Sequence, residues 1–183
     1  MITVNPESHA SSRPAVAYAP ITSPIGRLYL ASHETLIVAV GRSAGAIESS
    51  VCARFGHRPE RHATLPPPLA HAVAAHLDHG VESALRFDVR GLPEFDQAVL
   101  RAVQAIPRGE VRSYAWVARQ VGEPHAAMQV GIALHDNPIP VLIPCHRVVH
   151  SDGRLGGYVF GTHAKRALLR AEGVTLPLPG RAA

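Results

Sequence analysis

A cysteine stands beside a histidine and an arginine at the end of an apolar, proline-rich run. Residues 138–149 are Pro-Ile-Pro-Val-Leu-Ile-Pro-Cys-His-Arg-Val-Val, with Cys145, His146 and Arg147 in succession. A thiol reacts as its thiolate, and a neighbouring base or positive charge raises the thiolate fraction. Because Pro144 fixes one backbone angle and removes an N–H, the segment is predicted to form a specified bend. We interpret Cys145 as a presented nucleophile; a small buried hydrophobe is the alternative for an isolated pair of this kind.

The elements that must position this nucleophile form an α+β protein with two halves. Residues 14–91 predict an N-terminal α+β domain with a small antiparallel sheet, and residues 92–175 predict a mostly helical C-terminal domain, because the pattern changes at the Gly-Leu-Pro linker of residues 91–93. Residues 1–13 are expected to be a disordered N-terminus, and residues 176–183 a flexible tail. The N-terminal half predicts a hairpin within residues 15–40, helices over 44–54 and 69–79, and a strand over 85–89.

The C-terminal half predicts a helix-turn-helix before the cysteine. Ser113 can cap a helix whose apolar stripe includes Val117, and residues 122–124, Gly-Glu-Pro, break that helix. A second helix is predicted from residue 124 to about residue 135. Two short helices joined by a glycine-containing turn are typical of DNA-binding proteins, although many such pairs serve only core packing.

Composition limits the classes of function. The 183 residues are 46% hydrophobic and 17% charged, which fits a folded protein of one large or two small domains. No apolar stretch is long enough to span a bilayer and no secretion signal is present, so we expect a cytoplasmic protein that does not bind membranes. Cys52 and Cys145 are too isolated to predict a disulfide framework, and the 12 scattered histidines predict no metal site. A net charge of +4 leaves nucleic acid open as a partner.

Several motifs together resemble the O6-alkylguanine-DNA alkyltransferase family. They are Ser23-Pro24-Ile25-Gly26, Phe95-Asp96-Gln97, Ser113-Tyr114, Val130-Gly131, Asn137-Pro138, residues 143–149, Gly156-Gly157-Tyr158 and residues 168–173. The resemblance implies a suicide repair reaction without a cofactor, in which a monomer flips an alkylated guanine out of double-stranded DNA. The O6-alkyl group is then transferred irreversibly to Cys145.

The resemblance also implies roles for individual residues. His146 would act through a water as the general base for Cys145, Glu172 would orient His146, and Asn137 would hold the turn before the active-site strand. Tyr114 would donate its hydroxyl to the guanine, and the glycines at 156 and 157 would let their loop approach closely. The residues expected to line the alkyl and base pocket, together with Tyr114, are Val148, Tyr158 and Val159. The residues expected to contact DNA are Ser113, Ala127, Met128 and Arg147.

The sequence departs from the family at the helix that would meet DNA. Met128 stands where the family usually has an arginine that fills the space of the flipped base, and residues 123–137 contain no lysine or arginine. Phosphate neutralisation supplies much of DNA affinity, so Arg112, Arg119, Arg147 or Arg154 would have to compensate. Bulky Phe160 replaces a small pocket residue.

Three functions therefore remain open. The first is repair of O6-methylguanine in DNA, with Met128 acting as an apolar wedge. The second is a homologue whose Cys145 takes or relays an alkyl group from a small molecule, with weak or no DNA binding. The third, a lesion-binding protein without chemistry, is disfavoured because related lesion binders lack the cysteine. Cys52 is interpreted as buried packing.

Overall fold

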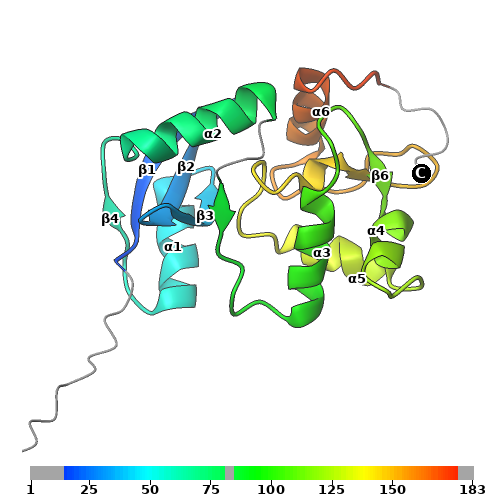
Figure 1. Cartoon of the computed structure of the whole chain (residues 1–183), viewed down its shortest axis with the longest axis horizontal. Helices are drawn as coiled ribbons and strands as arrows, with labels where there is room; N and C mark the ends of the chain where they lie inside the picture. The colour runs from blue at the N-terminus through cyan, green and yellow to red at the C-terminus, as the bar shows by residue number, and fades with distance from the viewer. Residues whose placement is uncertain (1–14, 81–84, 177–183) are drawn as a thin grey trace, which may run out of the picture.

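The computed structural model describes residues 15–80 and 85–176. Figure 1 shows a sheet with helices beside it in the first half of the chain and a group of helices in the second half. This arrangement confirms the predicted α+β class. The predictions for residues 1–13 and for nearly all of residues 176–183 lie outside the described residues.

The sheet of the first half is built on an antiparallel meander. Strands β1 (Ala17–Ser23), β2 (Gly26–His33) and β3 (Leu36–Gly41) pair in succession, as the predicted hairpin requires. Two short strands, β4 (Glu60–Arg61) and β5 (Arg86–Phe87), add in parallel at the edges and complete the order β4-β1-β2-β3-β5. The strand predicted over residues 85–89 is thus reduced to two residues.

The two faces of this sheet pack against different partners. Alternate side chains of a strand point to opposite faces, and Tyr18, Ala31 and Val38 pack with α1 (Ala44–Phe55) in one cluster. Leu28 and Leu30 face the other way and join a larger cluster that includes α2 (Pro67–His79). Helix α2 begins two residues earlier than predicted, because prolines are tolerated in the first helical turn.

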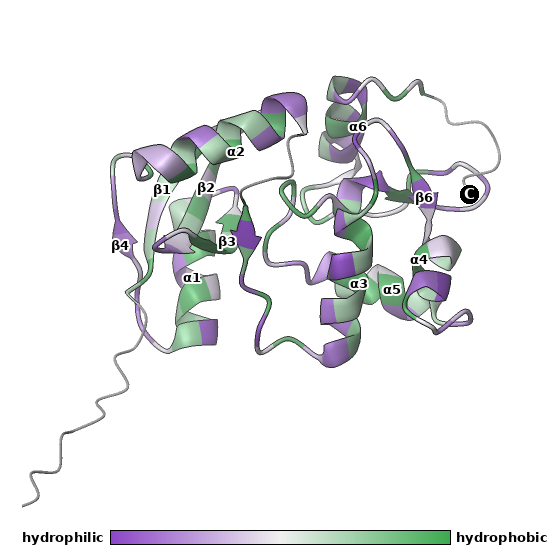
Figure 2. Cartoon of the chain, viewed as in Figure 1, coloured by the Kyte–Doolittle hydropathy of each residue, from purple (hydrophilic) through white to green (hydrophobic). Residues whose placement is uncertain are grey.

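The second half contains the helices that surround the cysteine. Helix α3 (Glu94–Gln104) buries Val99, Leu100 and Val103. Ser113 caps α4 (Tyr114–Gln120) as predicted, because its hydroxyl accepts a hydrogen bond from the Trp116 N–H at 3.1 Å. Figure 2 shows the hydrophobic residues of these helices turned mainly toward their neighbours.

Helix α5 (Ala127–His135) begins three residues later than predicted. The chain from Glu123 to Ala126 makes a turn instead, in which the Ala126 N–H bonds the Glu123 carbonyl at 2.9 Å. Cys145 begins a short 3-10 helix, η1 (Cys145–Arg147), which leads into β7 (Val148–Val149). Strand β7 pairs in parallel with β6 (Arg112–Ser113), and α6 (Thr162–Ala171) closes the half. The sequence did not predict α6.

The two halves share one hydrophobic cluster. It joins Leu30 of β2 and Val73 of α2 to Val103 of α3 and Leu142 of the segment before Cys145. A backbone hydrogen bond of 2.8 Å from the Val40 N–H to the Pro138 carbonyl connects the sheet directly to that segment. The sheet therefore supports the active-site segment, and the predicted domain boundary at residues 91–93 stays a prediction.

Within the residues that the structure describes, no helix is long and apolar enough to cross a membrane. The same residues contain no group of three or more histidine, cysteine, aspartate or glutamate side chains arranged to hold a metal ion.

Candidate active site

The segment that carries Cys145 is held from within by Asn137. Its Nδ2 donates to the Ile143 carbonyl at 3.2 Å and to Cys145 Sγ at 3.2 Å, while its Oδ1 accepts from the Ile139 N–H at 2.9 Å. The prolines of this segment have no N–H group that needs a partner, so the single buried amide of Asn137 can satisfy several of the remaining backbone groups of the bend. Asn137 therefore holds the turn and also contacts the sulfur directly.

The same bend contains a strained residue. Val141 has a φ of 76°, a left-handed conformation that β-branched residues rarely adopt. Its side chain is 5% exposed, so surrounding packing keeps it in place. Strain of this kind is found where the surrounding structure determines a functional geometry, and Val141 lies four residues before the cysteine.

The Cys145 thiol is buried and protonated at neutral pH. Burial raises the pKa of Cys145 from 9.0 to about 11, although the hydrogen bond from Asn137 and the charge of Lys165 act in the opposite direction. Since the thiolate is the nucleophile, a base must take the proton during the reaction. Asn137 and Lys165 are placed to stabilise the negative sulfur that results.

Lys165 is the most deeply buried charged residue near the sulfur. Its side chain is fully buried in α6, and Nζ donates to the Val148 carbonyl at 2.6 Å and to the Gly157 carbonyl at 3.2 Å. Burial lowers the pKa of Lys165 to about 8, against the opposing effect of Cys145. The amine therefore remains mainly charged at neutral pH, and it joins β7 to the loop at Gly157.

A buried group of three side chains lies behind the cysteine. His146 Nε2 is 2.8 Å from Glu172 Oε1, and Arg147 reaches the same carboxylate with Nε to Oε2 at 2.9 Å and Nη2 to Oε1 at 3.0 Å. The three side chains are 1–6% exposed. Burial alone would raise the pKa of Glu172, but the hydrogen bonds from His146 and Arg147 lower it to about 2. Glu172 is therefore ionised.

This carboxylate determines which nitrogen of His146 can accept a proton. An ionised carboxylate only accepts hydrogen bonds, so Nε2 must carry the ring proton. Burial lowers the pKa of His146 despite the opposing hydrogen bond to Glu172, which keeps the ring neutral at neutral pH. Its Nδ1 is buried and has no hydrogen-bond partner among the described residues. That lone pair is the available base, and its connection to Cys145 through a water stays a prediction.

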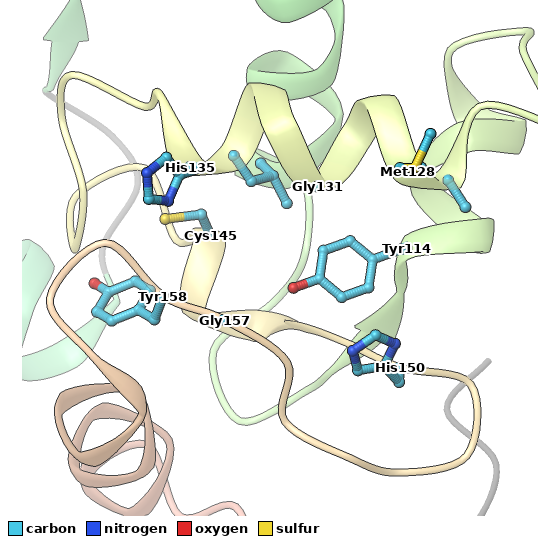
Figure 3. A pocket seen from close by; sticks show the side chains of 10 residues that line it. Tyr114, Met128, Gly131, His135, Cys145, His150, Gly157 and Tyr158 are labelled. Carbon is cyan, nitrogen blue, oxygen red and sulfur yellow. The ribbon is translucent and has the colours of Figure 1, made fainter.

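A pocket of about 290 Å³ opens over the thiol. Figure 3 shows Cys145 between α5 and the loop that carries Gly157 and Tyr158. Such a volume is at the small end for ligand sites and suits a single flat base. The residues that line it are Tyr114, Ala127, Met128, Gly131, Leu134, His135, Cys145, His150, Gly157 and Tyr158.

The loop over the pocket requires a glycine at one of the two predicted positions. Gly156 has a φ of 70°, and a Cβ there would lie 2.7 Å from the Tyr114 hydroxyl oxygen. Gly157 has open space around its Cα, so only Gly156 explains the close approach. Burial is the main cause that raises the pKa of Tyr114, and its hydroxyl therefore stays protonated as a hydrogen-bond donor.

The pocket mouth has an apolar helix face beside it. Met128 is 74% exposed and Ile132, one turn later on α5, is 58% exposed. The i, i+4 spacing places them on the same side of the helix. Exposed large apolar side chains next to a pocket point to contact with another molecule.

The structure brings together most of the residues predicted for the site, but four of them do not take the roles predicted for them. Val148 and Val159 do not line the described pocket: Val148 is buried behind it, and Val159 is 37% exposed. The expectation that Ser113 and Arg147 contact DNA does not fit their places in the fold. Ser113 is 2% exposed, and its hydroxyl accepts the hydrogen bond that caps α4. Arg147 is 5% exposed, and its guanidinium donates to Glu172 and to the Ile106 carbonyl.

Three features of the site were missed from the sequence. Lys165, the single lysine of the chain, was given no role, although leucines three and four residues after it could have suggested a buried helix face. His135 and His150 line the pocket, but no spacing relates them to Cys145. The Asn137 contact with sulfur depends on the bend and has no sequence signal.

Known proteins resemble this chain in both sequence and structure. Residues 94–174 match the family model "6-O-methylguanine DNA methyltransferase, DNA binding domain". A methylated-DNA–protein-cysteine methyltransferase of Mycobacterium bovis is 37% identical over 163 residues, which cover 86% of this chain and 92% of the relative. The chain belongs to this methyltransferase family. A member from Methanosarcina acetivorans is 35% identical over 159 residues, covering 85% and 97% of the two chains.

Solved structures of the family agree with the fold. The structure of Mycobacterium tuberculosis OGT in complex with DNA has a TM-score of 0.72 at 33% identity and covers 89% of this chain and 95% of OGT. An O6-methylguanine-DNA methyltransferase from Pyrococcus kodakaraensis, at 22% identity, has a TM-score of 0.66 and supports the fold alone. The family assignment made from the motifs is therefore confirmed.

Proposed function

We propose that this protein repairs DNA directly by transferring the alkyl group of O6-alkylguanine to Cys145. The observation that carries the proposal is the arrangement of the site. A buried thiol lies at a pocket the size of one base and accepts a hydrogen bond from Asn137, and the next residue is the neutral His146, which Glu172 orients. Family membership supports alkyl transfer to cysteine, and the DNA-bound OGT supports duplex DNA as the donor.

The reaction is a displacement at the alkyl carbon. His146 Nδ1 takes the Cys145 proton through a bridging water, and the sulfur attacks the alkyl carbon as the proton leaves. The new bond is S–C, the bond that breaks is C–O6, and its electron pair passes to the guanine. Tyr114 donates a hydrogen bond to the departing base, and the proton held by His146 returns to the guanine ring. The damaged base is thereby converted to guanine.

Each molecule of protein acts once. The product at Cys145 is a thioether, whose sulfur is neither an acid nor a thiolate nucleophile. The charge of Lys165 and the amide of Asn137 stabilise the thiolate that forms during the transfer. The neutral sulfur of a thioether gains no comparable stabilisation from them. The protein is therefore consumed in a single turnover, and no cofactor is required by the balance of the reaction.

The experiment is a single-turnover incubation with a duplex that carries one O6-methylguanine. Intact-mass spectrometry should show a gain of one CH2 unit, complete at one equivalent of DNA. Cys145→Ala should show no gain, and Cys52→Ala, which removes the other free cysteine, should react like the wild type.

One observation favours a small molecule as the alkyl donor in place of DNA: helix α5 has no lysine or arginine that could contact phosphates. A parallel incubation with free O6-methylguanine tests a small-molecule donor. Reaction with the free base and none with the duplex would replace DNA repair by the small-molecule function.

We further propose that the protein works in the cytoplasm. A lone nucleophilic thiol is kept reduced in that compartment, and Cys52 and Cys145 are both free cysteines in the structure. Cell fractionation with antibody detection tests the placement, and recovery from an extracellular fraction would contradict it.

A further inference from the structure

A second, larger pocket lies next to the active-site loop. It has a volume of about 590 Å³ and is formed between residues 153–156 and one face of α6. Thr162, Arg166 and Arg170 follow one another at intervals of four residues, so they share this face. Arg154 contributes a third guanidinium from the loop. We call this pocket the arginine cleft.

The positive charge of the arginine cleft is mostly not neutralised by acidic side chains among the described residues. Arg166 and Arg170 are exposed, and neither makes an ion pair with any residue that the structure describes. Arg154 pairs with Asp152 at 2.6 Å, but the two side chains are 77% and 52% exposed, and such pairs contribute little. Glu172, the sole acidic residue after Asp152 in the sequence, is already engaged by His146 and Arg147.

The charge of the cleft contrasts with the other side of the pocket. Helix α5 presents Met128 and Ile132 and has no lysine or arginine. A polyanion that reached the thiol over α5 alone would find no cation there. Figure 3 shows the loop at Gly157 and Tyr158 on the opposite side of Cys145 from α5, with α6 beyond it.

We propose that the arginine cleft binds phosphates of the DNA strand that carries the damaged base. The inference rests on the proposed function, because it takes duplex DNA as the substrate. Guanidinium groups match phosphate oxygens with two parallel hydrogen bonds, which favours arginine for this task. DNA is therefore held by apolar contact on the α5 side and by charge on the α6 side.

The loop makes this placement geometrically consistent. Gly156 lines the arginine cleft and also lies against the Tyr114 hydroxyl, whereas the next two residues, Gly157 and Tyr158, line the pocket over the thiol. Residues 153–158 therefore run from the arginine cleft to the pocket over the thiol. In our proposal, phosphates next to a base in the pocket follow this loop to Arg154 and the face of α6.

The test is the salt dependence of binding to undamaged duplex, measured by fluorescence anisotropy on the full chain. The Arg166→Gln/Arg170→Gln variant is compared with Arg27→Gln/Arg58→Gln, which removes the same charge from exposed positions of the N-terminal half. Each lost phosphate contact lowers the salt slope by about 0.9, so the first variant should lose about 1.8. Between about 50 and 200 mM salt, wild-type affinity should then fall about 12-fold more than that of the variant. The control variant should keep the wild-type slope.

A charge-retaining variant separates binding from folding. Arg166→Lys/Arg170→Lys should keep most of the slope that the glutamine variant loses. An unchanged slope in the glutamine variant, or an equal loss in the lysine variant, would overturn the arginine cleft as a phosphate site.

Different results would refute the proposed function and the arginine cleft. If wild-type protein neither binds duplex nor takes the methyl group from it, DNA repair itself is lost. If wild-type protein does both while the glutamine variant keeps its slope, only the arginine cleft is lost.

Discussion

The replacement Glu172→Gln removes the charge that organises the buried group behind the cysteine. In the wild type, this carboxylate accepts from His146 and from two nitrogens of Arg147, and all three side chains are at most 6% exposed. Glutamine has nearly the same size but no charge, and it can accept through one oxygen only. Arg147 would keep its bond to the Ile106 carbonyl and lose its counter-ion.

The cost follows from the pKa of the carboxyl. A pKa of about 2 instead of 4.5 for Glu172 corresponds to about 3 kcal/mol of stabilisation at neutral pH. Loss of one partner from a buried ion pair costs about 3–5 kcal/mol in proteins. The two magnitudes agree, so we expect Glu172→Gln to lower the free energy of unfolding by about 3 kcal/mol.

Urea denaturation of both proteins at neutral pH measures this difference. The matched control is Glu110→Gln, since Glu110 pairs with Arg112 but is 48% exposed. Its loss should cost less than about 1 kcal/mol. A Glu172→Gln loss no larger than that of the control would refute the conclusion that the buried carboxylate holds His146 and Arg147 in place.

The same difference should depend on pH with a defined sign. The folded pKa of Glu172 lies below the unfolded one, so its contribution is complete above pH 4.5 and disappears as the pH falls toward 2. The wild type should therefore exceed Glu172→Gln by about 3 kcal/mol at neutral pH and by about 1 kcal/mol at pH 3. A difference that grows in acid would have the wrong sign.

Three further replacements test individual parts of the site. Asn137→Ala should destabilise the fold by about 2–5 kcal/mol in urea denaturation, because two buried backbone groups lose their partner; a loss below 1 kcal/mol would contradict its place in the bend. Lys165→Met should slow transfer from duplex and from free base alike, by about tenfold for each unit by which the pKa of Cys145 rises, and single-turnover rates that match the wild type would remove Lys165 from the reaction. Met128→Arg should tighten binding to undamaged duplex and raise the salt slope by about 0.9, whereas an unchanged anisotropy titration would mean that this face of α5 does not meet DNA.

The fold was predictable where local chemistry determines structure. A turn followed by two apolar runs identified the hairpin before Gly41, and the Ser113 hydroxyl identified the start of α4. The errors lie at ends that depend on other segments. Strand β5 is short because its pairing with β3 covers only two residues, and α5 starts late because the chain after Gly122 makes its own turn.

Site residues that belong to a family motif could be predicted from the sequence, whereas roles that depend on burial and on contacts between distant segments could not. Cys145, His146 and Glu172 were named from the motif, and the structure brings the last two into contact. Arg147 was assigned to DNA because residues 123–137 contain no lysine or arginine, so another arginine would have to neutralise phosphates. Its partner Glu172 lies 25 residues away in the sequence and contacts it only through folding. The same reason hides Lys165, whose contacts are two carbonyls from separate elements.

The most direct measurement of the central claim locates the transferred group. A duplex with an isotopically labelled methyl on O6 of one guanine is incubated with the wild-type protein, and the protein is digested for tandem mass spectrometry. We predict one label per molecule, carried by the sulfur of Cys145, and unmodified guanine in the recovered DNA. A label on Cys52, or no label on the protein while the DNA is unchanged, would contradict alkyl transfer to Cys145.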